Sequence, residues 1–423
     1  MVARPGALRL TVAIARRGLF RLLSRIRGGR IEIDDDGRRF GFGPPDAGLR
    51  ATVRVGDPRA YSWALRGSTG LGEGYADGLW TTDDLLALTR IACRNLAPLD
   101  RWRGRVHAVI GPLERTIPLV PRNTRAGAAR HIAAHYDLGN ALFESFLDPR
   151  MIYSCAYFDE PGASLERAQL AKLERICSRL ELGPDDHLLE IGTGWGGLAI
   201  HAAGEHGARV TTTTISREQH AFATERVRAA GLGDRVEVLL RDYRDLRGRY
   251  DKLVSIEMIE AVGWQYFRTF FAKCAELLRA GGAMLMQAIV IDDRLYEAEK
   301  AARTFANKNI FPGGCLPSRR LIAELAAASG TPVAWWDDIT AHYPPTLAAW
   351  RERFERAWPR LEPLGYDQRF RRLWNFYLAS SEAGFREGRI GDVQTLLAKP
   401  AGAARSRRAA TRAVDEPGSV IGA

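Results

Sequence analysis

The chain has 423 residues, which is long for one hydrophobic core and predicts two domains with terminal extensions. Its composition, 46% hydrophobic and 26% charged, is that of a folded globular protein. No apolar run approaches the roughly 18 to 20 residues of a membrane-spanning helix. The net charge of +11 indicates attraction to a polyanion, either nucleic acid or an anionic lipid surface.

The cysteines and histidines show neither a disulfide framework nor a metal-ligand spacing. The five cysteines are odd in number, scattered and never in C-x-x-C, which favours a reducing cytoplasm. They are Cys93, Cys155, Cys177, Cys274 and Cys315. The eight histidines show no H-E-x-x-H or similar pattern, so we expect no metal.

Residues 4–27 are basic and have a helical period. Arginines fall largely off the apolar face, which comprises Leu8, Val12, Ala15, Leu19, Leu22, Leu23 and Ile26. Arg16 and Arg17 interrupt any secretory apolar region, so no cleaved signal peptide is expected. Two interpretations stay open for this segment, taken as 1–29: a helix in an anionic membrane interface, or a helix packed on the protein's own surface.

The remaining chain divides into regions of different pattern. Residues 30–100 predict a small α+β domain, and 101–127 form a Pro/Gly/Arg-rich linker. From 128 to 398, strands alternate with helices, which predicts a parallel, doubly wound sheet that binds ligands at the carboxyl ends of its strands. Residues 399–423 are expected to form a disordered basic tail.

The glycine cluster in LLEIGTGWGGLAIHAA, residues 188–203, suits either a dinucleotide or S-adenosylmethionine (SAM). A dinucleotide site needs an acidic residue about 20 residues later, at the end of the second strand. Here that strand ends TTTTIS, residues 211–216, without a carboxylate, whereas Asp242 is placed to reach an adenine amine. The pattern therefore favours a class I SAM-dependent methyltransferase. Its candidate cofactor residues are Glu190, Gly192, Gly194, Gly196 and Asp242.

Several long motifs follow one another between about residues 131 and 390. They are HYDLGNALFESFLDPRMIYSCAYF, LEIGTGWGGLAIHAA, TISREQ, RDYRDL, IEMIEAVG, NKNIFPGGCLPS and HYPPTLAAWRERF. In this order they resemble the cyclopropane-fatty-acyl-phospholipid synthase family, and GDPRAYSWALRGSTGLGEGYADGLWTTDDL resembles its N-terminal lipid-associated domain. The resemblance implies a doubly wound, Rossmann-like α/β methyltransferase domain that binds SAM, preceded by a small α+β lipid-associated domain.

The resemblance implies methyl transfer from SAM to a cis double bond in a phospholipid acyl chain. An alkene is a weak nucleophile, so the two reactants must be held in line. The resulting carbocation needs an apolar, aromatic-lined pocket that excludes water. In the family, the base that closes the ring is thought to be a bicarbonate held by a small polar cluster.

Carried over by position, Cys155, Glu260 and Tyr343 match members of that cluster, and Ile289 offers its backbone. Glu257 stands three residues before Glu260 and is expected on the same helical face, just after a strand end. The SAM contacts map to Tyr153, Ser154, Gly192, Gly194, Thr214, Gln219 and Tyr243, and the expected pocket walls are Tyr157, Phe158 and Trp264. The residues alone favour a small buried hydrophobe for Cys155, and for Tyr343 they also allow a packed loop residue.

The sequence departs from the family pattern at the predicted cluster. Ala261 and Gln287 stand where ring-forming members tend to have histidine, Glu257 stands where a glycine is usual, and Thr193 replaces a common cysteine. Glutamine can bind an anion but cannot take a proton near pH 7 as histidine can. We hypothesise that Glu257 and Gln287 reshape the cluster, which leaves bicarbonate binding and the product open.

The expected function is a SAM-dependent C-methyltransferase that forms cyclopropane rings on unsaturated phospholipid. One alternative is an exocyclic methylene product, the precursor of a methyl branch, which requires a partner reductase; another is a non-catalytic lipid-binding protein with a SAM fold. The charge also suits a nucleic-acid methyltransferase, but no N-P-P-Y tetrad, Pro-Cys pair or RNA platform is present, so we expect no nucleic-acid partner. We expect a cytoplasmic enzyme at the inner face of an anionic membrane, with a homodimer left open.

Overall fold

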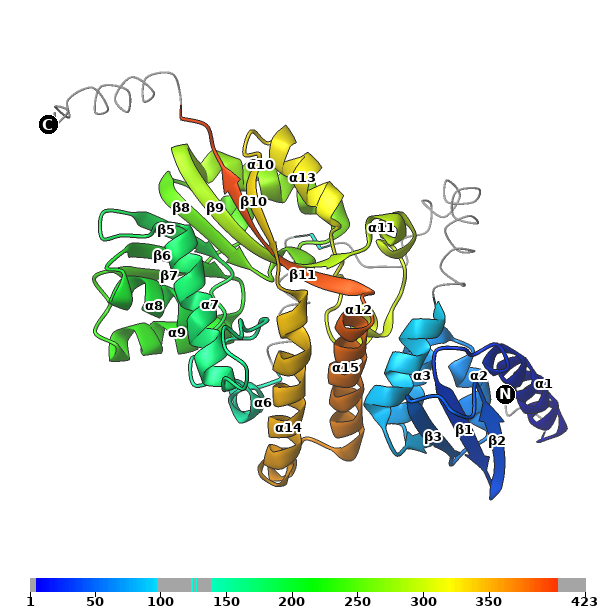
Figure 1. The fold of residues 1–423 in the computed structure, drawn as a ribbon. Coiled ribbons are helices and arrows are strands. Elements are labelled where there is room, and N and C mark those ends of the chain that lie inside the picture. Colours follow the sequence, from blue (N-terminus) through cyan, green and yellow to red (C-terminus); the bar gives the residue numbers. More distant parts are fainter. Residues whose placement is uncertain (1–4, 97–122, 125–126, 128–137, 402–423) are drawn as a thin grey trace, which may run out of the picture.

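The computed structural model describes residues 5–96, 123–124, 127 and 138–401, and contains two sheets with their own helices (Figure 1). The larger sheet has the strand order β10-β11-β9-β8-β5-β6-β7. Its strands are β5 (His187–Ile191), β6 (Arg209–Thr214), β7 (Val236–Leu240), β8 (Tyr250–Ile256), β9 (Leu278–Ile291), β10 (Val333–Asp338) and β11 (Ile390–Ala398). The predicted doubly wound α/β fold is confirmed.

The sheet is parallel from β7 to β9, but β11 runs antiparallel to both β9 and β10. The sequence pattern predicts neither β10 nor β11 as a strand. The apolar pattern of β11 is interrupted by Asp392 and Gln394, which are buried within the sheet. Asp392 belongs to the polar cluster described below, and Gln394 Nε2 donates to Gln287 Oε1 at 3.1 Å, so buried polar residues concealed this strand.

Helices cover the strands as the alternating pattern predicts. Helix α7 (Leu165–Arg179) is capped by Ser164, whose side chain accepts a hydrogen bond from the Arg167 N–H. The helices around the sheet are α6 (Asn140–Phe146), α7 (Leu165–Arg179), α8 (Gly197–Glu205), α9 (Arg217–Ala229), α10 (Phe267–Leu277), α11 (Asp293–Glu299), α12 (Phe305–Asn309) and α13 (Arg319–Ala328). Single 3₁₀ turns lie at Tyr243–Asp245, Ile259–Ala261, Trp264–Tyr266, Thr340–His342 and Glu362–Leu364.

Two long helices, α14 (Tyr343–Leu361) and α15 (Gln368–Arg386), pack side by side and extend away from the sheet (Figure 1). Their shared core is aromatic and includes Trp350, Phe354 and Trp374, all nearly inaccessible to solvent. Trp350 and Trp358 are core residues. Trp335 is only partly buried, because it lies on the edge strand β10 under the guanidinium groups of α7.

The smaller sheet is mixed, with the order β2-β1-β3-β4. Its elements are α1 (Pro5–Leu23), β1 (Arg30–Asp35), β2 (Arg38–Phe42), β3 (Arg50–Val55), α2 (Arg59–Ala64), α3 (Gly67–Ala76), β4 (Trp80–Thr82) and a helix at residues 85–96. Helix α1 packs on this sheet through Phe20 and Leu23. Leu22, which the periodicity placed on the apolar face, is 54% exposed, and Ile14 is 61% exposed.

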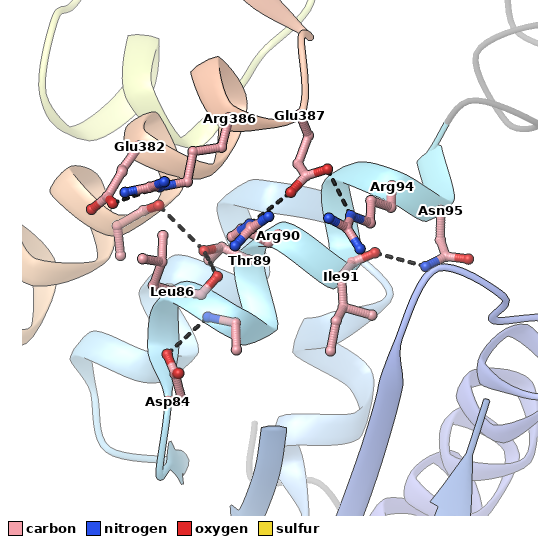
Figure 2. Close-up of polar contacts among 12 residues, drawn as sticks. Asp84, Leu86, Thr89, Arg90, Ile91, Arg94, Asn95, Glu382, Arg386 and Glu387 are labelled. Atoms are coloured by element: carbon pink, nitrogen blue, oxygen red, sulfur yellow. Dashed lines mark hydrogen bonds and ion pairs between the residues drawn. The ribbon is translucent and has the colours of Figure 1, made fainter. Parts of the chain in front are cut away.

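The small domain contacts α15 through a charged cluster (Figure 2). Glu387 accepts hydrogen bonds from Arg90 Nε at 2.6 Å and from Arg94 Nε at 2.7 Å. The Thr89 hydroxyl also donates to the Ala379 carbonyl, at 3.3 Å. These contacts join the helix at residues 85–96 to the helical pair that packs beside the larger sheet.

The boundaries expected from the sequence fall mainly outside the described residues. The predicted linker at 101–127 and tail at 399–423 are described only at 123–124, 127 and 399–401. Within the described part of the chain, no helix is both long and apolar enough to cross a membrane.

Candidate active site

A cavity of about 180 Å³ lies at the carboxyl ends of β5 and β6, where a doubly wound sheet binds its ligand. Nine of the ten predicted cofactor residues line it: Tyr153, Ser154, Glu190, Gly192, Gly194, Thr214, Gln219, Asp242 and Tyr243. The tenth residue, Gly196, does not line the cavity. It caps α8 with a φ of 84°, and a Cβ there would meet Ala223 at 3.2 Å. A glycine is therefore suited to this position because it accepts the left-handed backbone and leaves room for α9 to pack closely.

The loop after β5 presents backbone to the cavity. Gly192 and Gly194 have φ values of 107° and 53°, in the left-handed region that favours glycine. A Cβ at Gly194 would meet no atom of the described residues within 4 Å, so its backbone faces open space. The loop therefore allows a ligand to approach the main chain closely.

Buried threonine hydroxyls support this loop from β6. Thr212 donates to the Glu190 carboxyl at 2.6 Å and contacts the Thr193 hydroxyl at 2.7 Å. Burial raises the pKa of Glu190 to about 8, so its carboxyl is protonated at neutral pH. Thr214, at the end of the strand, donates to Gln219 Oε1 at 2.8 Å and so positions that side chain beside the cavity.

Asp242 and Tyr243 border the other side of the cavity. Both oxygens of Asp242 already accept hydrogen bonds from Arg244, at 2.8 and 2.6 Å. The buried Tyr243 hydroxyl has no hydrogen-bond partner among the described residues, and its ring packs edge-on against Phe270. The expected contact of Asp242 with an adenine amine would thus add to an existing ion pair.

The sequence analysis missed Lys172, a fully buried residue of α7 that lines the same cavity. Its Nζ donates to the Ser154 hydroxyl at 2.6 Å, and burial lowers its pKa to about 8. A lysine among the buried residues of an amphipathic helix was the signal available in the sequence.

Beside this cavity, a second polar cluster is centred on Glu257, which also lines the cavity. Glu257 Oε1 accepts hydrogen bonds from the Cys155 backbone N–H at 2.8 Å and from Gln287 Nε2 at 2.7 Å. Its Oε2 accepts a hydrogen bond from the Tyr343 hydroxyl at 2.6 Å. The structure therefore gathers four of the five predicted catalytic residues around one carboxylate.

Glu257 directly follows β8 and has a φ of 46°, which is unusual for a residue other than glycine. Its backbone N–H donates to the Gln287 carbonyl of β9 at 2.9 Å, which fixes this conformation. Glu260 lies on the following 3₁₀ turn, so the two glutamates do not share a helical face as expected. The strained backbone explains why a glycine would suit position 257.

Glu260, the fifth predicted catalytic residue, is hydrogen-bonded to strand β9. Its Oε1 accepts a hydrogen bond from the Ile289 N–H at 2.6 Å, while its buried Oε2 has no partner among the described residues. Burial, together with the charge of Glu257, raises the pKa of Glu260 to about 8. Glu260 therefore carries a proton at neutral pH.

Asp392 on β11 completes the cluster and was not predicted. Its Oδ2 accepts a hydrogen bond from Gln287 Nε2 at 3.0 Å. Burial first, and then the charge of Glu257, raises the pKa of Asp392 well above its usual range. Burial therefore opposes ionisation of both Glu260 and Asp392.

Cys155 contributes its backbone to this cluster, while its thiol points elsewhere. The Sγ contacts the Ala156 carbonyl at 3.3 Å, and burial raises the pKa of the thiol well above its usual value. Such a thiol is a poor nucleophile because the thiolate is the reactive form.

A separate bicarbonate does not fit this arrangement. The Cys155 N–H and the Tyr343 hydroxyl, two of the groups expected to hold it, already bind the Glu257 carboxylate. A second anion beside Glu257 would place two like charges in a buried cluster, which is unfavourable.

The three aromatic residues expected as pocket walls lie elsewhere. Tyr157 and Phe158 pack against His342, and Trp264 packs against the core under α10, with Lys300 Nζ 5.2 Å from its ring centroid. The aromatic residues that line the cavity are Tyr153, Trp195 and Tyr243. Tyr153 contacts Trp350, Phe143 and Phe146, and its hydroxyl hydrogen-bonds that of Tyr377 at 2.9 Å.

Comparison with known proteins identifies the family. Residues 123–395 match the family described as mycolic acid cyclopropane synthetase. The chain belongs to this family. Among the family's relatives, it is 41% identical over 340 residues to tuberculostearic acid methyltransferase UfaA1 of Mycobacterium tuberculosis, covering 78% of this chain and 79% of that protein. It is 38% identical over 350 residues to the cyclopropane-fatty-acyl-phospholipid synthase of Escherichia coli K12, covering 79% and 85%.

A solved structure agrees with the family assignment. Mycolic acid cyclopropane synthase CmaA1, complexed with SAH and CTAB, matches with a TM-score of 0.60 and 31% identity, covering 64% of this chain and 98% of that one. The predicted family, enzyme class and cofactor are confirmed: this member of the mycolic acid cyclopropane synthetase family is a SAM-dependent methyltransferase of fatty acids or phospholipids.

Proposed function

We propose that this enzyme methylates the cis double bond of an unsaturated phospholipid acyl chain and releases an exocyclic methylene product, the precursor of a mid-chain methyl branch. The observation that carries the proposal is the Glu257 carboxylate, bound at the centre of the polar cluster by Cys155, Gln287 and Tyr343. The relative at 41% identity, which is named a tuberculostearic acid methyltransferase, supports it.

Bound SAM supplies a methyl group on a positively charged sulfur. The alkene attacks this methyl group, so a C–C bond forms as the C–S bond breaks, and a cation remains on the neighbouring alkene carbon. A hydride shift from the methylated carbon moves the cation onto that carbon, and loss of a methyl proton then forms the methylene. Direct loss of the methyl proton with closure would form the cyclopropane instead, so the timing and position of proton removal decide the product.

In this proposal, Glu257 is the base that takes the methyl proton. Its three hydrogen-bond donors fix both carboxylate oxygens, so the base is oriented before the cation forms. Glu260 is protonated at neutral pH and burial opposes ionisation of Asp392, so we assign the proton acceptor to Glu257. A base tethered to the chain has a fixed position, and we infer that this position favours hydride shift before proton loss.

The cofactor cavity has groups suited to SAM. The exposed backbone of the glycine loop and the side chains of Gln219 and Asp242 would hold the adenosyl portion, and Tyr153 would face the reacting end. Glu190 supports the loop in its neutral form.

The N-terminal helix supplies a surface for the lipid. Exposed Arg17 and Arg21 lie on α1 together with exposed Ile14 and Leu22, and exposed Arg25 follows just after the helix, a combination suited to the interface of an anionic membrane. The methylene product would still need a reductase to become a saturated methyl branch.

Cyclopropane formation is the second candidate, favoured by the 38% identity to a cyclopropane-fatty-acyl-phospholipid synthase. Purified enzyme, SAM and vesicles of a cis-monounsaturated phospholipid distinguish the two by proton NMR of the released fatty acids. Methylene protons in the olefinic region support the proposal, and upfield ring protons refute the proposed product. Failure to methylate any of several unsaturated phospholipids refutes the proposed substrate.

A further inference from the structure

A second cluster of potential ligands lies between α7 and α8, outside the active site. Glu174 and Cys177 lie on α7, His201 lies on α8, and His206 caps the end of α8. One ligand atom from each of Cys177, His201 and His206 lies within 4.8 Å of the other two. The Glu174 oxygens lie 3.1 Å from His201 Nε2 and 3.3 Å from His206 Nε2.

The two imidazoles are not satisfied by these neighbours. Both Nε2 atoms are buried and lack a hydrogen bond of acceptable geometry to any residue that the structure describes, despite the nearby carboxylate. His201 is only 6% exposed. Burying polar nitrogens without partners is costly, so such groups call for an explanation such as an ion.

We propose that Glu174, Cys177, His201 and His206 bind a zinc ion in a closed, tetrahedral site. Thiolate, imidazole and carboxylate are all zinc ligands, with bonds of about 2.0 to 2.3 Å that place neighbouring ligand atoms about 3.3 to 3.8 Å apart. The two glutamate–histidine distances are already close to this range. The ligand atoms of Cys177, His201 and His206 lie up to 4.8 Å apart, and side-chain shifts of about 1 Å would bring them to the distances that zinc requires.

The bound ion would clamp α7 to α8. Helix α7 carries Lys172, which donates to Ser154 at the cofactor cavity, and α8 begins at Gly197, which lines the same cavity. The four ligands leave no open position for substrate, which is typical of structural zinc. The site therefore stabilises the support of the cofactor cavity and takes no part in the reaction.

Cobalt(II) is the probe for this site, because it occupies zinc sites and absorbs visible light. The full-length protein is stripped with a chelator, titrated with cobalt(II), and then competed with zinc. We expect a thiolate-to-cobalt charge-transfer band and intense tetrahedral ligand-field bands, both lost when zinc is added. Zinc should also raise the Tm of the stripped protein, since a ligand that binds the native state stabilises it.

Variants test the four ligands separately. Cys177→Ser should abolish the charge-transfer band, whereas Cys274→Ser, at an equally buried cysteine in another core, should retain it. Glu174 is half-exposed and His206 is partly exposed, so substitutions at these two positions should disturb folding least. If Cys177→Ser does not fold, the variants Glu174→Gln and His206→Gln test the site. Each should weaken cobalt affinity roughly tenfold or more, since even residues behind the ligands contribute that much.

Three results would overturn the site. They are an absence of cobalt binding in the stripped wild-type protein, a charge-transfer band that persists in folded Cys177→Ser, and unchanged affinity in both Glu174→Gln and His206→Gln.

Discussion

Replacing Glu257 by glycine separates its chemistry from its structural role. The residue has a φ of 46°, so glycine accepts its backbone conformation at least as well as glutamate does. The matched variant Glu257→Gln keeps the side-chain volume and removes the charge. Both variants lack the proposed base, but only the glycine variant opens space beside Cys155 and Tyr343.

The expected change in stability is small because opposing effects partly cancel. Left-handed backbone costs a residue other than glycine about 1 to 2 kcal/mol, which the glycine variant regains. Three hydrogen bonds, at 2.8, 2.7 and 2.6 Å, lose their acceptor. Each contributes about 0.5 to 1.5 kcal/mol net, or up to about 3 with a charged partner, and water entering the space replaces part of this loss. We expect the free energy of unfolding to fall by no more than about 3 kcal/mol.

The expected change in rate is large. A positioned general base contributes about 10² to 10⁴ in rate, equivalent to about 3 to 5 kcal/mol of barrier. SAH release and product NMR, measured in bicarbonate-free buffer, should therefore show at least a hundredfold loss in both variants. Added bicarbonate should restore part of the activity in Glu257→Gly, because the Cys155 N–H and Tyr343 hydroxyl become available to bind it. Glu257→Gln still fills the space and should not respond.

Wild-type turnover by Glu257→Gly without bicarbonate would refute Glu257 as the base. A thermal unfolding curve of each variant provides the control, because an unfolded variant would lose activity for an unrelated reason.

Three further predictions concern the product, the pH dependence of stability and the membrane. Gln287→His should increase the cyclopropane fraction by adding a second proton acceptor beside Glu257, and an unchanged product ratio in NMR would rule out a role for this position. The raised pKa of Glu190 means that the folded protein keeps a proton that the unfolded chain releases, so the free energy of unfolding should fall as the pH rises from the usual glutamate range through about 8. Urea titrations across this range should show a shallower fall for Glu190→Gln, and an unchanged slope would contradict this assignment. Arg17→Glu with Arg21→Glu should weaken sedimentation with anionic vesicles but not with zwitterionic ones, and equal loss on both would contradict electrostatic docking.

Local sequence patterns predicted the framework of the cofactor site. The alternation of strands and helices, the glycines after β5 and the absence of a carboxylate at the end of β6 together indicated a SAM site. Four of the five residues predicted from these patterns line the cavity, and the other five predicted residues that line it came from the family resemblance. The local patterns place residues at the cavity because such a site is built from backbone at strand ends, and a strand–turn–helix with left-handed glycines has a local signature.

Tertiary structure decided which groups meet Glu257. Its hydrogen-bond partners stand 102, 30 and 86 residues away along the chain, and Asp392 arrives on a strand whose buried polar residues concealed it. The unpredicted cluster of Cys177, His201 and His206 has the same origin, since two helices bring its members together. The family resemblance implied a bicarbonate in this cluster, and the sequence left its binding open. In the structure, the Cys155 N–H instead donates to the carboxylate of Glu257, a left-handed residue after β8, because only the packed fold determines which donor and acceptor share one buried space.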